Sequence, residues 1–147
     1  MNSTEVSMKR KYKLFIWMIL ILSTILLTGC KSEEADIKKI KDIDFTIVED
    51  SELPEELKML INDKKVKPFK TTWNNEDMDY LYIVVGYGQQ PSGGFSVTVD
   101  ELFLTSNSIF ISTNLIGPKP EELVTQVITY PYVVVKIEYM DKSVVFN

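Results

Sequence analysis

The sequence predicts a small, mainly β domain, either an antiparallel β-sandwich or an open barrel, with one short amphipathic helix. Two observations predict this fold class. Short segments rich in Val, Ile, Tyr and Phe recur through residues 42–147 and are separated by Gly, Pro, Asn and Asp. Helical spacing of apolar residues occurs in only one segment, residues 53–65. Many short strands with a single helix are typical of a sheet-on-sheet architecture.

The first two predicted elements are a strand and the helix. In residues 42–49, apolar side chains alternate at Ile43, Phe45 and Ile47, which indicates a half-buried strand. The helix is predicted to begin near Pro54, because proline is favoured in a first turn and acidic residues follow it. One helical face collects Leu53, Leu57, Leu60 and Ile61, so we expect the helix to cover the sheet.

The next strands are predicted to be an edge strand and a central strand. Residues 66–73 contain Pro68, which cannot donate to a sheet ladder and therefore favours an edge position. Residues 74–79 form a polar turn, and their acidic side chains lack the spacing of a calcium loop. Residues 80–85 are apolar on both faces, which indicates a central strand that is covered on both sides.

The remaining strands are predicted from alternation and from turn residues. They are residues 95–99, a hairpin of residues 102–104 with 109–113, residues 133–139 and residues 144–146. The segment Gly117-Pro118-Lys119-Pro120 breaks the chain between the hairpin and the strand at 133.

A glycine-rich loop, residues 86–95, connects two of these strands and is the main candidate for a binding site. It contains four of the six glycines of the chain, together with Pro91, so its backbone is expected to be shaped. A nucleophilic role for Ser92 would need a general base. Because the chain has no histidine, that base would have to be a lysine, and nothing in the sequence indicates which lysine it would be. A phosphate cradle is disfavoured because the loop holds no Lys or Arg and opens a strand. Two interpretations of the loop remain: a rigid loop that binds a protein, and a hairpin turn whose glycines only satisfy the backbone geometry.

Residue types that the chain lacks exclude most enzyme chemistry. There is no histidine, the only arginine is Arg10, and the only cysteine is Cys30. Catalytic triads, imidazole metal ligands, thiolate clusters and intrachain disulfides are therefore excluded. After residue 29 the chain has 12 lysines and 20 acidic residues, a formal balance of −8, which disfavours nucleic acid as a partner. We expect no enzyme, no cofactor and no metal site.

The N-terminus has the layout of a bacterial lipoprotein signal peptide. Basic residues 9–13 precede an apolar run, residues 14–27, which ends in Leu27-Thr28-Gly29-Cys30. This tetrapeptide resembles a lipobox, in which the cysteine is lipidated, for example by palmitate, and becomes the first mature residue. The expected organisation is a signal peptide (1–29), a flexible tether (30–41) and one domain (42–147), held at the extracytoplasmic face of the cell membrane by a lipid on Cys30.

Two motifs resemble the C-terminal domain of the PrcB family. The loop Gly88-Gln89-Gln90-Pro91-Ser92-Gly93-Gly94-Phe95 is similar to the family pattern G-x-x-P-T/S-G-G-aromatic between two strands. The segment Thr129-Tyr130-Pro131-Tyr132-Val133-Val134-Val135-Lys136-Ile137 is similar to its later proline-bearing strand. The resemblance covers about residues 80–137, with Ser92 and Phe95 where threonine and tyrosine are commoner. It implies an accessory lipoprotein subunit of a surface protease complex, which is not itself the peptidase.

The leading functional prediction is therefore a lipid-anchored protein that binds a protein partner, a secreted or surface protease. Two alternatives stay open: a chagasin-like protease inhibitor acting by loop insertion, and a cell-wall carbohydrate-binding module with an aromatic platform of Trp73, Tyr80 and Tyr82. The residues expected to contact the partner are Gly88, Gln89, Gln90, Pro91, Ser92, Gly93, Gly94, Phe95, Tyr130, Pro131 and Tyr132.

Overall fold

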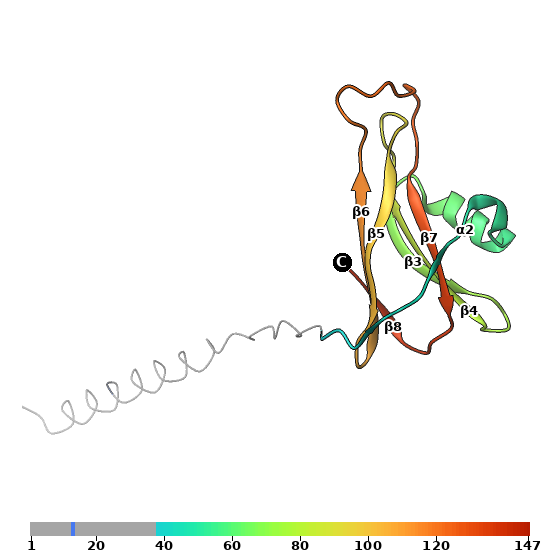
Figure 1. The fold of residues 1–147 in the computed structure, drawn as a ribbon, viewed down its shortest axis with the longest axis vertical. Helices are drawn as coiled ribbons and strands as arrows, with labels where there is room; N and C mark the ends of the chain where they lie inside the picture. The colour runs from blue at the N-terminus through green and yellow to red at the C-terminus, as the bar shows by residue number, and fades with distance from the viewer. Residues whose placement is uncertain (1–12, 14–37) are drawn as a thin grey trace, which may run out of the picture. The chain divides into compact units, whose positions relative to one another are not determined.

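Two four-stranded β-sheets and one α-helix make up the domain in the computed structural model, which describes Lys13 and residues 38–147 (Figure 1). The predicted signal peptide apart from Lys13, the lipidation site Cys30 and most of the predicted tether lie outside the described residues. Within the described part of the chain, no helix is both long enough and apolar enough to cross a membrane.

The elements follow one another from Lys41 to Phe146. They are β1 (Lys41–Asp42), β2 (Thr46–Ile47), the 3-10 helix η1 (Asp50–Glu52), α2 (Glu55–Lys64), β3 (Pro68–Asn74), β4 (Tyr80–Tyr87), β5 (Ser96–Leu104), β6 (Ser108–Ile116), β7 (Tyr132–Glu138) and β8 (Ser143–Phe146).

The strand order is β1-β5-β6-β8 in the first sheet and β2-β7-β4-β3 in the second. All pairs are antiparallel except β6 with β8, which is parallel. The sheets pack face to face around a core that includes Ile83, Ile109, Ile111 and Val135. The predicted mainly β fold class is confirmed, and of the two predicted forms the molecule has the sandwich.

β4 is buried on both faces, as its sequence predicts. Leu81, Ile83 and Val85 point into the core between the sheets. Tyr82 and Val84 point the other way, into a second apolar layer under α2. β4 lies inside the second sheet, whereas β3, which begins at Pro68, lies at its edge, so both predicted positions are confirmed.

α2 covers the outer face of the second sheet (Figure 1). The carbonyl oxygen of Pro54 accepts the first helical hydrogen bond from the amide of Lys58 at 3.0 Å. Leu53, Leu57 and Ile61 are all buried, and they pack in the same apolar layer as Val84 and Val134. The predicted amphipathic helix is therefore confirmed, including the face that it buries.

The single strand predicted over residues 42–49 is wrong. The chain instead forms the two short strands β1 and β2, which belong to different sheets. Ile43 is buried in the core between the sheets and Val48 in the layer under α2, whereas Phe45 and Ile47 are 41% and 54% exposed. The physical reason is that the chain crosses from one sheet to the other here, so strict alternation cannot keep one face buried.

Candidate functional site

Two long loops lie together at one end of the sandwich. The glycine loop (residues 88–95) connects β4 to β5, and the β6–β7 connection (residues 117–131) is here called the arm. Figure 1 shows both above the upper ends of the strands, with the arm outermost. The structure therefore brings together the two segments that the sequence singled out.

Backbone hydrogen bonds attach the glycine loop to the arm. Gln90 and Thr129 exchange two of them, from the Gln90 amide at 2.8 Å and from the Thr129 amide at 3.1 Å. The Gly93 amide donates to the Thr125 carbonyl at 2.9 Å. The Thr129 hydroxyl donates to the Ser92 carbonyl at 2.6 Å. The loop is therefore folded back against the arm and does not project alone.

Close approach to the arm explains two of the glycines. A Cβ atom on Gly93 would lie 2.5 Å from the Oγ1 atom of Thr125. Gly94 has φ +83°, and a Cβ atom there would lie 2.6 Å from Cγ1 of Val124. Side chains are disfavoured at positive φ and cannot occupy these gaps. The glycines are thus required by the contact between loop and arm.

The predicted partner-binding residues differ in how far they reach the surface. Gln89, Pro91 and Gly94 are exposed, and Gly88 and Ser92 are buried; the half-buried residues are Gln90, Gly93, Phe95, Tyr130, Pro131 and Tyr132. A chagasin-like insertion of this loop would have to break its hydrogen bonds to the arm. Contact between these predicted residues and a partner stays a prediction.

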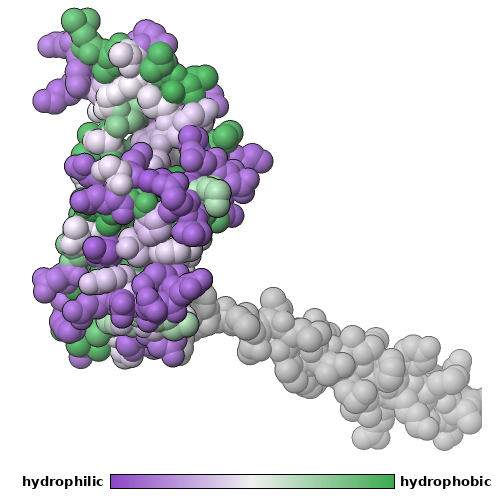
Figure 2. All heavy atoms as spheres, turned by 90° about the vertical axis from the view of Figure 1, so that its right-hand side faces the viewer, coloured by the Kyte–Doolittle hydropathy of each residue, from purple (hydrophilic) through white to green (hydrophobic). Residues whose placement is uncertain are grey.

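The arm exposes apolar side chains that the sequence predictions did not select. Leu123 is 101% exposed, and Val127 and Ile128 are 57% and 55% exposed. Figure 2 shows apolar side chains gathered at this end of the molecule. The signal in the sequence is two apolar pairs, residues 123–124 and 127–128, between the proline-rich break at Gly117 and the strand that begins at Tyr132.

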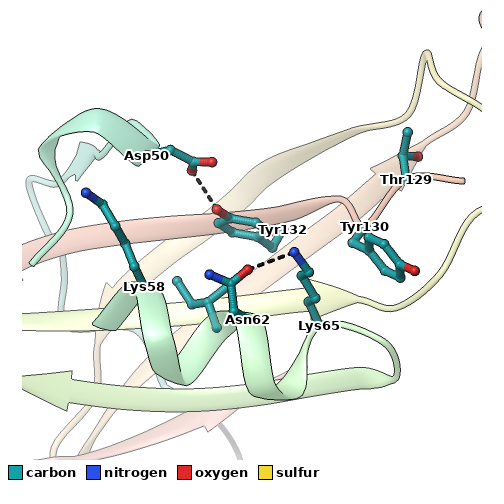
Figure 3. A pocket seen from close by; sticks show the side chains of 8 residues that line it. Asp50, Lys58, Asn62, Lys65, Thr129, Tyr130 and Tyr132 are labelled. Atoms are coloured by element: carbon teal, nitrogen blue, oxygen red, sulfur yellow. Dashed lines mark hydrogen bonds between the residues drawn. The ribbon is translucent and has the colours of Figure 1, made fainter. Parts of the chain in front are cut away.

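A groove lies between α2 and the start of β7, next to the glycine loop. Its volume is about 360 Å³, and its lining residues are Asp50, Lys58, Ile61, Asn62, Lys65, Thr129, Tyr130 and Tyr132. Figure 3 shows Asn62 and Lys65 rising from the C-terminal end of α2 toward Tyr132, whereas Lys58 extends away from the two tyrosines, on the side of Asp50. This hollow is called the α2–β7 groove below. Of the predicted site residues, it contains only Tyr130 and Tyr132.

Hydrogen bonds and ring contacts fix the side chains of this groove. The Tyr132 hydroxyl donates to Oδ1 of Asp50 at 2.6 Å, and the Lys65 ammonium donates to Oδ1 of Asn62 at 2.7 Å (Figure 3). Nζ of Lys65 also lies 5.4 Å from the centre of the Tyr130 ring. Desolvation, followed by the hydrogen bond and the charge of Asp50, raises the pKa of Tyr132 well above its ordinary value of 10.0.

Replacing Tyr132 by phenylalanine tests this hydrogen bond. We expect the free energy of unfolding at pH 7 to fall by about 1 kcal/mol, measured by urea denaturation, because the Asp50 carboxylate loses its donor. At alkaline pH the unfolded tyrosine ionises before the folded one, so the unfolded state binds fewer protons and stability falls as the pH rises above 10.0. Tyr132→Phe should remove this part of the alkaline loss.

Tyr130→Phe is the matched control, since it removes a hydroxyl from the neighbouring ring of the same groove. Its stability should follow that of the wild type through the alkaline range. Parallel curves for the wild type and Tyr132→Phe between about pH 9 and pH 11.5 would show that burial and Asp50 together do not raise the pKa of Tyr132 in the folded state.

The aromatic platform of the carbohydrate-binding alternative is not formed. Tyr82 is buried, at 9% exposure, and its ring meets that of Trp73 edge to face at an interplanar angle of 65°. Tyr80 is 43% exposed, but Nζ of Lys136 lies 4.9 Å from the centre of its ring. Coplanar, exposed rings are needed to stack on a sugar, so these three residues do not provide that surface. Within residues 38–147, no cluster of acidic side chains is arranged to hold a metal ion.

Comparison with known families confirms the resemblance seen in the motifs. Residues 81–138 match the family model described as PrcB C-terminal. The matched segment runs from β4 to β7 and includes both the glycine loop and the arm. Neither the curated proteins nor the solved structures gave a match to the chain.

Proposed function

We propose that this chain, whose residues 81–138 match the PrcB C-terminal family, is a non-catalytic subunit that binds and supports a secreted or surface protease. In this proposal a lipid on Cys30 holds it at the extracytoplasmic face of the cell membrane. The arm, supported from below by the glycine loop, forms the contact face. The family match supports association with a protease complex, and the lipobox supports the anchor.

The observation that carries the proposal is that the arm exposes apolar side chains while hydrogen bonds hold its backbone to the glycine loop. Leu123 is fully exposed, and Val127 and Ile128 are more than half exposed. Burying one such side chain contributes about 1.5 to 3 kcal/mol, so the three together can drive a specific contact. Exposed apolar side chains gathered in one place are typical of surfaces that bind proteins.

The arm is also held in place before any partner arrives. Its backbone is bonded to the glycine loop at Thr125 and Thr129. Near its start, the Lys119 amide donates to Oε2 of Glu122 at 3.1 Å, and the Glu122 amide donates to the Lys119 carbonyl at 2.9 Å. An arm that is already ordered loses less conformational entropy on binding, so more of the apolar contact energy appears as affinity.

A supporting role, as opposed to a peptidase role, agrees with the residue types of the chain. The sequence has no histidine, and its single cysteine is Cys30. Ser92, the serine of the glycine loop, is buried, and its hydroxyl donates to the Gly93 carbonyl at 3.1 Å. A serine held in this way is not presented to a substrate.

The test is retention of protease activity by the immobilised full chain, purified in mild detergent. Detergent-solubilised cell envelope is passed over the wild type and over Leu123→Asp, and retained casein hydrolysis is measured. We expect Leu123→Asp to retain at least about tenfold less activity, since a buried, unpaired carboxylate opposes the contact. Met59→Asp is the matched control, because Met59 is 65% exposed on α2 and belongs neither to the arm nor to the lining of the α2–β7 groove.

Two results would contradict the proposal. Equal retention by Leu123→Asp and the wild type would remove the arm as the contact face. A retained protease whose activity falls when the purified chain is added would show inhibition and not support. A supporting subunit should instead lengthen the half-life of the protease activity at 37 °C by mass action.

A further inference from the structure

We infer that the α2–β7 groove binds a short acidic peptide segment that carries one apolar side chain. The inference rests on the proposed function, because the segment would belong to the same protein partner. The groove is distinct from the apolar face of the arm, because none of Leu123, Val127 and Ile128 lines it. Its lining comes from η1, from α2 with its C-cap Lys65, from the last residues of the arm (Thr129 and Tyr130) and from the first residue of β7.

Charge is the first reason. Beyond Lys41 the chain has eight lysines, and five of them lie between residues 58 and 70, whereas the region after residue 29 is acidic as a whole. These five are Lys58, Lys64, Lys65, Lys67 and Lys70. On α2 they are interspersed with Glu55, Glu56 and Asp63, and two of them, Lys58 and Lys65, line the groove beside a single acidic residue, Asp50. The groove lining therefore has a net positive charge on a domain that is acidic as a whole, and a positively charged hollow attracts an anionic ligand.

The spacing of the two lysines sets the size of the ligand. Lys58 and Lys65 are seven residues apart on one side of α2, with Asn62 between them (Figure 3). A helix rises about 1.5 Å per residue, so their backbones are about 10 Å apart. An extended peptide rises about 3.3 Å per residue, and three of its residues therefore span the distance between the two lysine backbones.

Both ammonium groups are available to a carboxylate. Nζ of Lys58 is 2.8 Å from Oε1 of Glu55, whose side chain is 80% exposed. An ion pair this exposed contributes little, so a ligand carboxylate can replace it. Lys65 is held over the Tyr130 ring by Asn62, which places its charge at the edge of the groove. The one acidic side chain in the lining, Asp50, already accepts the hydrogen bond of Tyr132.

The floor and one wall of the groove provide the apolar part. Ile61 lies in the lining and is only 2% exposed, and the rings of Tyr130 and Tyr132 are half-buried beside it. A hollow of about 360 Å³ holds one large apolar side chain. The pattern that fits is an apolar residue with acidic residues on both sides of it.

A peptide fits this charge distribution better than a long polyanion does. The basic stretch is short, and the domain outside it carries an excess of acidic residues. A nucleic acid or polyphosphate chain would extend past the groove onto surface that repels it. A short peptide stays within the basic stretch and also uses the apolar floor.

The test uses a fluorescein-labelled, amidated pentapeptide, Glu-Asp-Phe-Asp-Glu, and fluorescence anisotropy with the full chain in mild detergent. Lys58→Glu combined with Lys65→Glu should weaken binding at least about tenfold, because two attractions become repulsions. Lys38→Glu combined with Lys119→Glu is the matched control, since it makes the same change in net charge at exposed lysines outside the groove. It should weaken binding less than about twofold. Circular dichroism melts check that both variants are folded.

Replacing the phenylalanine of the probe by alanine should weaken binding at least about fivefold. Equal binding of the alanine peptide, equal loss in the two double variants, or stronger binding of inorganic polyphosphate would overturn the inference. Leu123→Asp should bind the pentapeptide as the wild type does. If the wild type fails to bind the pentapeptide but still retains protease through Leu123, the groove inference fails and the proposed function stands.

Discussion

Replacing Gly94 by alanine is expected to detach the arm from the glycine loop, with a local cost of about 2 to 3 kcal/mol. Two physical effects add. Gly94 has φ +83°, and its new Cβ atom would lie 2.6 Å from Cγ1 of Val124 and 3.0 Å from Cβ of Pro118. The arm must therefore move away, which strains its hydrogen bonds at Thr125 and Thr129.

Hydrogen exchange measures this effect at the amides that join the two loops. Protection at Gly93 and Thr129 should fall roughly 30- to 150-fold, which is the factor that corresponds to 2 to 3 kcal/mol. Gly117→Ala is the matched control in the same region. Gly117 does not have a positive φ, and its new Cβ atom would lie 3.2 Å from the Phe95 ring, which can shift. Equal protection in the two variants would mean that Gly94 does not set the packing of the arm.

The expected result changes how the glycine motif is interpreted. The sequence shows that Gly93 and Gly94 shape a loop, but not what the loop is shaped against. In the structure the neighbour is the arm, at Val124 and Thr125, so bulky residues at these glycines would disturb the arm and the loop at once. A binding defect in such variants would not separate the two, whereas Leu123→Asp changes only an exposed side chain.

Most strand positions could be predicted from local pattern. β4 is apolar on both faces because the first sheet covers one face and α2 covers the other, and Pro68 confines β3 to an edge because it lacks an amide hydrogen. The crossing between Ile43 and Val48 could not be predicted, since alternation indicates a face but not the sheet to which it belongs. The parallel pairing of β8 with β6 likewise depends on tertiary packing, which the local sequence pattern does not indicate.

The candidate site was predicted only in part, because its residues come from distant segments. Tyr130 and Tyr132 flank Pro131 and are among the predicted partner-binding residues, and both line the groove. Their partners Asp50 and Lys65 lie about 65 to 80 residues earlier in the chain. In the sequence, Lys65 fits the end of a helix, where a cation complements the helix dipole. That local role is sufficient to explain it, so the pattern gives no sign of the groove.

Replacing Leu57 by alanine is expected to lower the free energy of unfolding by about 3 kcal/mol. Leu57 is fully buried in the first turn of α2 and packs in the layer that contains Val84 and Val134. Alanine removes three carbon atoms there and leaves a cavity, because the strands on the other side are fixed by the core between the sheets. The melting temperature should fall by about 10 to 20 °C for a domain of this size.

Met59→Ala is the matched control, since Met59 lies on the same helix and is 65% exposed. Its effect should stay within about 0.5 kcal/mol. A loss for Leu57→Ala no larger than this would mean that α2 is not part of the cooperative core. α2 carries the groove residue Ile61 and ends at its C-cap Lys65, which also lines the groove. Loosening the helix should therefore weaken pentapeptide binding while the hydrogen bonds between the glycine loop and the arm stay protected. That separation is expected because the hydrogen bonds that attach the arm run to the glycine loop at Gln90, Ser92 and Gly93, whereas the end of the helix meets the arm through the Lys65 ammonium and the Tyr130 ring.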